Sequence, residues 1–255
     1  MDIARLKSLK GVRKIAMLTA YDYQMAKILD AAGVDILLVG DSLGMVVLGF
    51  DGTKAVTMDD MARHTEAVAR GTESALVVSD MPVSTYDTIE CALENAARLL
   101  DAGADAVKLE GNKSEVVYAL IASGIPVMGH VGLLPQTADR FRVRGKKGGE
   151  AERIYMDALE LDGLGVFSIV LECIPLGLAK RITEAVGALT IGIGAGAHCD
   201  GQVLVVNDML GMEESFEPKH VKRYASLSET IREAALKYIA EVQTGIFPGD
   251  EHSFH

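Results

Sequence analysis

The fold is decided by a short stretch, Ala102-Gly-Ala-Asp-Ala-Val-Lys-Leu-Glu110. Its Ala-Gly pair is typical of the end of a helix, and the apolar run that follows is typical of a strand buried on both faces. The acid stands where that strand leaves the core. The same order recurs in residues 32–41, which end at Asp41, and in residues 164–172, which end at Glu172. Each copy therefore predicts a helix end that feeds a parallel strand.

Eight strand-like runs are spread over the chain, and stretches with helical spacing separate most of them. Eight strands with intervening helices predict a (β/α)8 TIM barrel; the competing architecture is an open, doubly wound sheet. No Pro/Ser-rich linker divides the sequence, so we predict a single domain over 1–255, with an N-terminal extension and C-terminal helices. The runs lie near residues 15–20, 36–41, 75–81, 106–110, 126–131, 168–173, 189–194 and 203–207.

The composition limits the partners that the chain can have. The 255 residues are 49% hydrophobic, enough for a large core, and carry a formal net charge of −11. Because a nucleic-acid groove needs a concentrated basic surface, we expect small-molecule partners and no nucleic acid. No apolar run is long enough for a membrane span, so we expect no membrane partner. Three cysteines without metal-type spacing indicate reduced thiols in a cytoplasmic protein.

Four of the apolar runs end on a carboxylate, at Asp41, Asp80, Glu110 and Glu172. In a (β/α)8 barrel the carboxyl ends of all strands meet at one mouth, where the active site lies. Acids that lie close together repel unless a cation or a proton is placed between them. Asp41, Asp80 and Glu110 offer oxygen ligands without accompanying His or Cys, which suits Mg²⁺. The plain alternative is that each acid caps a helix or pairs with a nearby base.

Lys108 lies two residues before Glu110, so both side chains should point into the barrel from the same strand. A buried lysine needs a partner. A substrate carboxylate or one of the metal-ligand acids would provide it, and a purely structural ion pair is the alternative.

Glu172 and His130 are the candidates for chemistry at the remaining strand ends. If the other three acids hold a metal, Glu172 is left to transfer a proton; the alternative is a fourth metal ligand or a lysine partner. His130 ends the fifth strand, where it would polarise an oxygen or orient the site. His64 lies on an amphipathic helix, which indicates a structural role.

A basic cluster follows the fifth strand in an otherwise acidic chain. A loop at this position lies above the barrel mouth, where it would meet an anionic ligand tail or a neighbouring subunit, or remain solvated. The cluster comprises Arg140, Arg142, Arg144, Lys146 and Lys147.

An ordered set of short segments closely resembles the ketopantoate hydroxymethyltransferase family, of the phosphoenolpyruvate mutase and isocitrate lyase superfamily. The resemblance extends from Ala20 to Phe254, and the set as a whole is specific although each piece alone is weak. The segments are Val39-Gly-Asp-Ser-Leu-Gly-Met45, Ser79-Asp-Met-Pro82, Val107-Lys-Leu-Glu-Gly111, Gly129-His-Val-Gly-Leu133, Leu171-Glu-Cys173, Gly192-Ile-Gly-Ala-Gly196 and Asp200-Gly-Gln202.

The resemblance implies a homodecameric (β/α)8 enzyme that transfers a hydroxymethyl group from 5,10-methylenetetrahydrofolate to 3-methyl-2-oxobutanoate. The product would be 2-dehydropantoate, used in pantothenate synthesis, and the route would pass through a Mg²⁺-stabilised enolate. By motif match, Asp41, Asp80 and Glu110 would surround Mg²⁺, partly through water. The keto acid would contact Asp41, Ser42, Asp80 and Lys108, with His130 beside it, and Glu172 would accept the proton.

The chain departs from the usual family sequence in Asp139-Arg-Phe-Arg-Val-Arg-Gly-Lys146, at Val83 and at Asn207. These departures leave the metal and base positions unchanged. We hypothesise that the basic loop meets the glutamate tail of the folate. Two other functions stay open: a folate-independent lyase or aldolase acting on a 2-oxo acid, and a metal-dependent binding barrel.

Overall fold

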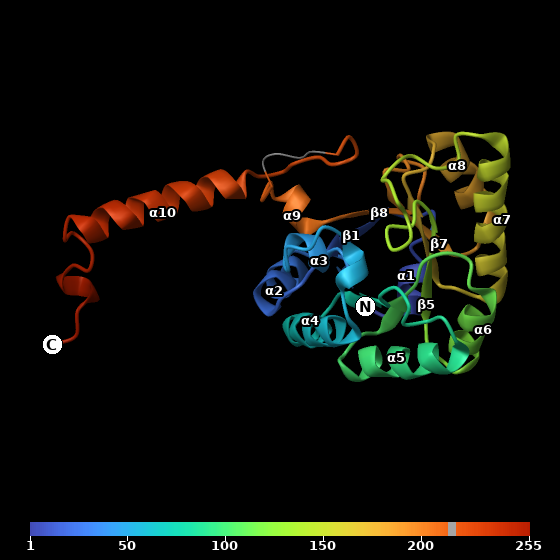
Figure 1. Cartoon of the computed structure of the whole chain (residues 1–255), viewed down its shortest axis with the longest axis horizontal. Coiled ribbons are helices and arrows are strands. Elements are labelled where there is room, and N and C mark those ends of the chain that lie inside the picture. Colours follow the sequence, from blue (N-terminus) through green and yellow to red (C-terminus); the bar gives the residue numbers. More distant parts are fainter. Residues whose placement is uncertain (214–217) are drawn as a thin grey trace. The chain divides into compact units, whose positions relative to one another are not determined.

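The computed structural model describes residues 1–213 and 218–255, which form two compact units, Met1–Val205 and Val206–His255. In the first unit eight parallel strands pair in chain order, and the eighth pairs with the first, so the sheet closes (Figure 1). This confirms the (β/α)8 barrel; one domain over 1–255 stays a prediction. The strands are β1 (Ile15–Thr19), β2 (Ile36–Val39), β3 (Leu76–Asp80), β4 (Ala106–Lys108), β5 (Val127–Gly132), β6 (Ser168–Glu172), β7 (Leu189–Ile193) and β8 (Gly201–Leu204).

Helices alternate with these strands and cover the outside of the barrel (Figure 1). Both faces of the strands are therefore shielded, which explains why β2 is apolar at every position. The first unit contains α1 (Ile3–Lys7), α2 (Tyr23–Ala31), α3 (Leu43–Val46), a 3₁₀ turn η1 (Thr53–Ala55), α4 (Met58–Gly71), α5 (Ile89–Asp101), α6 (Ser114–Ala122), α7 (Gly148–Leu164) and α8 (Leu176–Ala185).

Local signals in the sequence set several helix starts. Thr57 accepts from the backbone N–H of Asp60, whose carboxylate accepts from the backbone N–H of Thr57, and this capping box begins α4. Within α4, His64 hydrogen-bonds through Nδ1 to the backbone oxygen of Tyr21 at 2.5 Å. This contact agrees with the structural role expected for His64.

The end of the barrel where the strands begin is closed by the N-terminal segment. Leu6 of α1 is fully buried, and it belongs to the same core cluster as interior residues of the strands such as Ile15 and Ile36. After this helix, the Arg13 guanidinium donates two hydrogen bonds to the Asp35 carboxylate, and Lys10 Nζ lies 2.6 Å from Asp200 Oδ2. This closed end leaves the opposite mouth, at the strand carboxyl ends, for a site.

The second unit contains α9 (Val206–Met209), α10 (Leu227–Gln243) and a 3₁₀ turn η2 (Asp250–His252). The eighth strand was expected near 203–207 but ends at Leu204, because the chain turns into α9 at Val206. Every residue of α10 is at least partly exposed. No helix among the described residues is long and apolar enough to cross a membrane.

Candidate active site

The mouth of the barrel gathers the charged side chains that the sequence singled out. Asp80 ends β3, Glu110 lies two residues beyond β4, and Glu172 ends β6. Asp41 follows β2 by two residues, so it too stands at this rim. Asp41, Asp80, Lys108, Glu110 and His130 are all buried, whereas the Glu172 side chain is 16% exposed. Glu172 is thus the acid with the most open access.

Lys108 has a partner inside the barrel, and that partner is Asp80. The two residues are in register on β4 and β3, and Lys108 Nζ lies 2.6 Å from Asp80 Oδ1. The other Asp80 oxygen accepts from the backbone N–H of Asp41 at 3.1 Å. Burial lowers the pKa of Lys108, but Asp80, Glu110 and Asp41 outweigh it and raise that pKa above its usual value, so Lys108 is a cation.

Asp41 and Glu110 carry the charge that this lysine does not balance. Burial and the neighbouring Asp80 raise the pKa of Asp41 to about 7. Burial, opposed by Lys108 but reinforced by Asp41 and Asp80, raises the pKa of Glu110 to about 9. With Asp80, three buried carboxyl groups share one ammonium, so the site attracts either protons or a cation.

His130 lies between two of these acids. Its Nε2 is 3.2 Å from Glu172 Oε2, and its Nδ1 is 3.6 Å from Glu110 Oε1. Neither ring nitrogen makes a well-aligned hydrogen bond among the described residues. Burial and the charge of Lys108 lower the pKa of His130, so the ring is neutral and has one N–H for the two carboxyl groups. His130 therefore contacts the expected proton acceptor directly.

Ser42 is held at the rim by a tyrosine from the preceding strand end. Ser42 Oγ and the Tyr21 hydroxyl lie 2.9 Å apart, and Ser42 is the first residue before α3. It follows Asp41 directly, so its hydroxyl stands beside the acid cluster. Tyr21 was not a candidate from the sequence.

Gln136 is the main member of the cluster that sequence reasoning missed. It is 2% exposed, in the loop after β5, and its side-chain nitrogen donates to Asp41 Oδ2 at 2.8 Å. Its backbone N–H donates to Glu110 Oε2 at 3.1 Å. The hydroxyl of Tyr86 in turn donates to Gln136 Oε1 at 2.5 Å. No periodic pattern marks Gln136, because only the path of the loop brings it to the acids.

The donor set fits a hard divalent cation. Three buried carboxyl groups at one lysine leave an excess of negative charge, and carboxylate oxygens are the ligands that Mg²⁺ prefers. Among the described residues, however, no group of three or more His, Cys, Asp or Glu side chains is arranged to hold an ion directly. A cation here would therefore need water or substrate oxygens to complete its shell, as Mg²⁺ commonly does.

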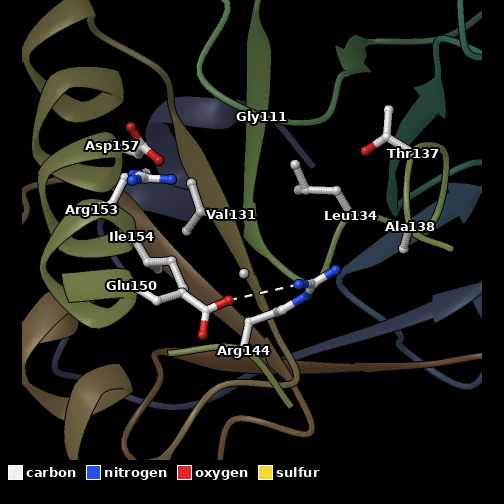
Figure 2. A pocket seen from close by; sticks show the side chains of 11 residues that line it. Gly111, Val131, Leu134, Thr137, Ala138, Arg144, Glu150, Arg153, Ile154 and Asp157 are labelled. Carbon is white, nitrogen blue, oxygen red and sulfur yellow. Dashed lines mark ion pairs between the residues drawn. The ribbon is translucent and has the colours of Figure 1, made fainter. Parts of the chain in front are cut away.

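A separate pocket of about 220 Å³ lies beside the mouth, between the end of β5, its following loop and the start of α7 (Figure 2). Of the basic loop only Arg144 lines it, and Figure 2 shows Arg144 paired with Glu150 of α7, at 3.7 Å. The lining residues are Gly111, Val131, Gly132, Leu134, Thr137, Ala138, Arg144, Glu150, Arg153, Ile154 and Asp157. Because none of the clustered acids is among them, the pocket adjoins the cluster without containing it.

Solved structures share this barrel at low sequence identity. A phosphoenolpyruvate phosphomutase from Streptomyces platensis subsp. rosaceus matches with a TM-score of 0.66 and 12% identity, over 96% of this chain and 88% of that one. A 2,3-dimethylmalate lyase, described as a PEP mutase/isocitrate lyase superfamily member, matches with a TM-score of 0.61 and 15% identity, over 99% and 91%. These likenesses show the fold.

Sequence comparison is more specific. The family model of ketopantoate hydroxymethyltransferase matches residues 1–250. A 3-methyl-2-oxobutanoate hydroxymethyltransferase of Syntrophus aciditrophicus is 56% identical over 252 residues, covering 96% of this chain and 93% of the relative. One of the same name from Caldicellulosiruptor saccharolyticus is 54% identical, covering 97% and 96%. The chain therefore belongs to the ketopantoate hydroxymethyltransferase family of enzymes.

Proposed function

We propose that this chain transfers a hydroxymethyl group from 5,10-methylenetetrahydrofolate to 3-methyl-2-oxobutanoate, giving 2-dehydropantoate for pantothenate synthesis in the cytoplasm. The observation that carries the proposal is the buried acid cluster at the barrel mouth, with Lys108 inside it and Glu172 at its more open side. The names of relatives more than half identical to this chain support the same reaction.

Asp41, Asp80 and Glu110 would hold Mg²⁺, partly through water. When bound, Mg²⁺ would polarise the 2-oxo group and stabilise the negative charge that develops as C3 loses its proton. The excess charge of the cluster supports this assignment, because two of its acids have no lysine or arginine within ion-pair distance in the described part of the chain.

Glu172 and Lys108 would act on the keto acid itself. Glu172 would take the C3 proton, and its partial exposure supports this role because a substrate can reach it. Lys108 would hold the substrate carboxylate. Only one of its three N–H donors is used among the described residues, by Asp80, so two remain for substrate oxygens. Ser42 and His130 would complete the substrate contacts on either side.

The pocket beside the mouth would take the tail of the folate. It combines the apolar side chains of Val131, Leu134 and Ile154 with two guanidinium groups, of Arg144 and Arg153, and two carboxylates, of Glu150 and Asp157. At about 220 Å³ it is smaller than the roughly 300–1,000 Å³ typical of whole small-molecule sites, so it would take only one part of the folate. Replacing Arg144 by glutamine should raise the KM for the folate and leave that for the keto acid unchanged. Replacing Lys146 and Lys147, which do not line the pocket, tests separately whether the rest of the basic loop meets the folate tail.

The chain would work as a homo-oligomer, a decamer by family resemblance. The second unit supports association, because α10 exposes large apolar side chains along its length. These include Ile231, Leu236, Tyr238, Ile239 and Val242. Light scattering of the full chain measures the assembly size.

The reaction is tested by product formation. The full chain is incubated with 3-methyl-2-oxobutanoate, Mg²⁺ and 5,10-methylenetetrahydrofolate, and 2-dehydropantoate is measured by mass spectrometry. We expect product only when the folate and the metal are both present. Cleavage or condensation of the keto acid without folate would instead show a lyase or aldolase, and binding without turnover would show a binding barrel.

A further inference from the structure

We infer that Gln136, locked by Tyr86, is a positioning residue that holds the Asp41 and Glu110 carboxyl groups in place for the divalent cation. This inference rests on the metal site of the proposed function, and it assigns a role to a residue outside the expected ligand set. Its basis is a set of hydrogen bonds that joins four separate loops at the barrel mouth.

Gln136 ties together the ends of three strands from the loop that follows a fourth. Its Nε2 donates to Asp41 Oδ2 after β2, at 2.8 Å, and to the backbone oxygen of Met81 after β3, at 2.9 Å. Its backbone N–H donates to Glu110 Oε2 after β4. One buried residue thus fixes one oxygen on each of the two acids that lack a cationic partner.

The amide of Gln136 has only one orientation that satisfies all its neighbours. Both hydrogens of Nε2 go to acceptors, and Oε1 accepts from the Tyr86 hydroxyl. A flipped amide would place an oxygen against a carboxylate and a carbonyl. Tyr86 is itself buried and lies 3.4 Å from the backbone nitrogen of Glu110, so it braces the same acid.

A neutral amide suits this position better than a basic side chain. An arginine or lysine would balance the charge of Asp41 and compete with a cation for its oxygens. Gln136 orients the Asp41 carboxyl group with a hydrogen bond and, being neutral, leaves the negative charge of Asp41 available to a cation. Groups that orient metal ligands in this way typically contribute about 10- to 100-fold to metal affinity.

The test is the affinity of the substrate-free protein for Mg²⁺ and Mn²⁺, measured by titration calorimetry and by Mn²⁺ electron paramagnetic resonance. Gln136→Met keeps the volume and the backbone N–H but removes the side-chain donors. We expect its metal affinity to fall about 10- to 100-fold. Gln202→Leu is the matched control: its amide donates only to the backbone oxygen of Gly196 among the described residues, and we expect wild-type affinity.

A double-variant cycle separates positioning from general loss of structure. Tyr86→Phe should lower metal affinity by less than Gln136→Met, and the effect of the double variant should fall short of the sum of the two single effects, because Tyr86 acts mainly through the amide. If Gln136→Met does not fold, a wild-type affinity in folded Tyr86→Phe overturns the inference. Equal metal binding by the wild type and Gln136→Met also overturns it, while the proposed function stands. Failure of the wild-type protein to bind either metal instead removes the metal site itself.

Discussion

The two ends of the barrel use buried acids in opposite ways. Asp35 stands just before β2 and accepts two hydrogen bonds from Arg13 and one from the backbone N–H of Ala16. Burial alone would raise the pKa of Asp35, but these hydrogen bonds outweigh it and lower the pKa. Asp41 stands just after the same strand, where burial and Asp80 raise its pKa to about 7.

The difference shows which end is built for the fold and which for a ligand. At the closed end each buried acid has a basic partner, as Asp200 has Lys10, so its charge is satisfied within the protein. At the mouth three acids share one cation, Lys108, so their excess negative charge attracts a proton or a bound cation. Acids of the first kind should support stability, whereas those of the second should oppose it and support activity.

The largest expected effect is at Glu172. Glu172→Gln removes the proposed proton acceptor without changing its size, so turnover should fall by about 10²- to 10⁴-fold. The melting temperature should change little, because the side chain is partly exposed and has no buried cationic partner in the described residues. Steady-state kinetics and calorimetry measure the two effects. Wild-type turnover in this variant would remove Glu172 from the chemistry.

The next effect is at the closed end. Asp35→Asn loses the charge that binds Arg13, so the free energy of unfolding should fall by about 2 kcal/mol, a value reduced by the half-exposed position of Arg13. Urea denaturation measures this loss. The kcat at a temperature where the variant is folded should equal that of the wild type; a lower kcat would mean that the two ends are not separate in function.

A smaller effect of opposite sign is expected at the mouth. Asp41→Asn removes a buried charge that raises the energy of the folded, metal-free protein, so the free energy of unfolding near neutral pH should increase by about 1 kcal/mol. Metal binding should be lost in the same variant. Urea denaturation in EDTA, compared with Asp35→Asn, measures the contrast. Destabilisation by both substitutions would break the distinction between the two ends.

The contrast between the two ends also extends to the pH dependence of stability. Because the pKa values of Asp41 and Glu110 are raised, to about 7 and about 9, these two groups bind more protons in the folded protein than in the unfolded chain between about pH 4 and pH 9. Stability without metal should therefore fall as pH rises through this window, and the melting temperature should fall with it. Asp35 has a lowered pKa, so its contribution is lost only as pH falls below about 4.

Melting curves in EDTA measure this pH dependence. Saturating Mg²⁺ should flatten the fall, since a bound cation favours the ionised acids. A rise in the stability of the metal-free protein toward pH 9 would contradict the assignment of unbalanced charge to the mouth.

The fold and the acids could be predicted from the sequence because their signals are local. Each strand run, its preceding helix end and its terminal acid lie within about ten residues, as in the stretch from Ala102 to Glu110. Parallel strand order then places Asp80 and Glu110 at one rim. Their proximity follows from topology alone.

The partners of those acids could not be predicted in the same way. The pairing of Lys108 with Asp80 depends on the register of β3 and β4, which no single run encodes, so the sequence left its partner open. Gln136 reaches Asp41 across 95 positions of the chain, by the path of a loop without periodicity. Arg153, which lines the pocket, lies on α7 and so outside the basic cluster of residues 140–147.

The most direct test of the account is the exchange of the C3 hydrogen of 3-methyl-2-oxobutanoate with deuterated solvent, followed by proton NMR with Mg²⁺ and without folate. The wild-type protein should exchange this hydrogen, and removal of Mg²⁺ should stop the exchange. Glu172→Gln should bind the keto acid and fail to exchange it. Undiminished exchange in Glu172→Gln, or its absence in the wild type, would contradict a mouth built to take this proton.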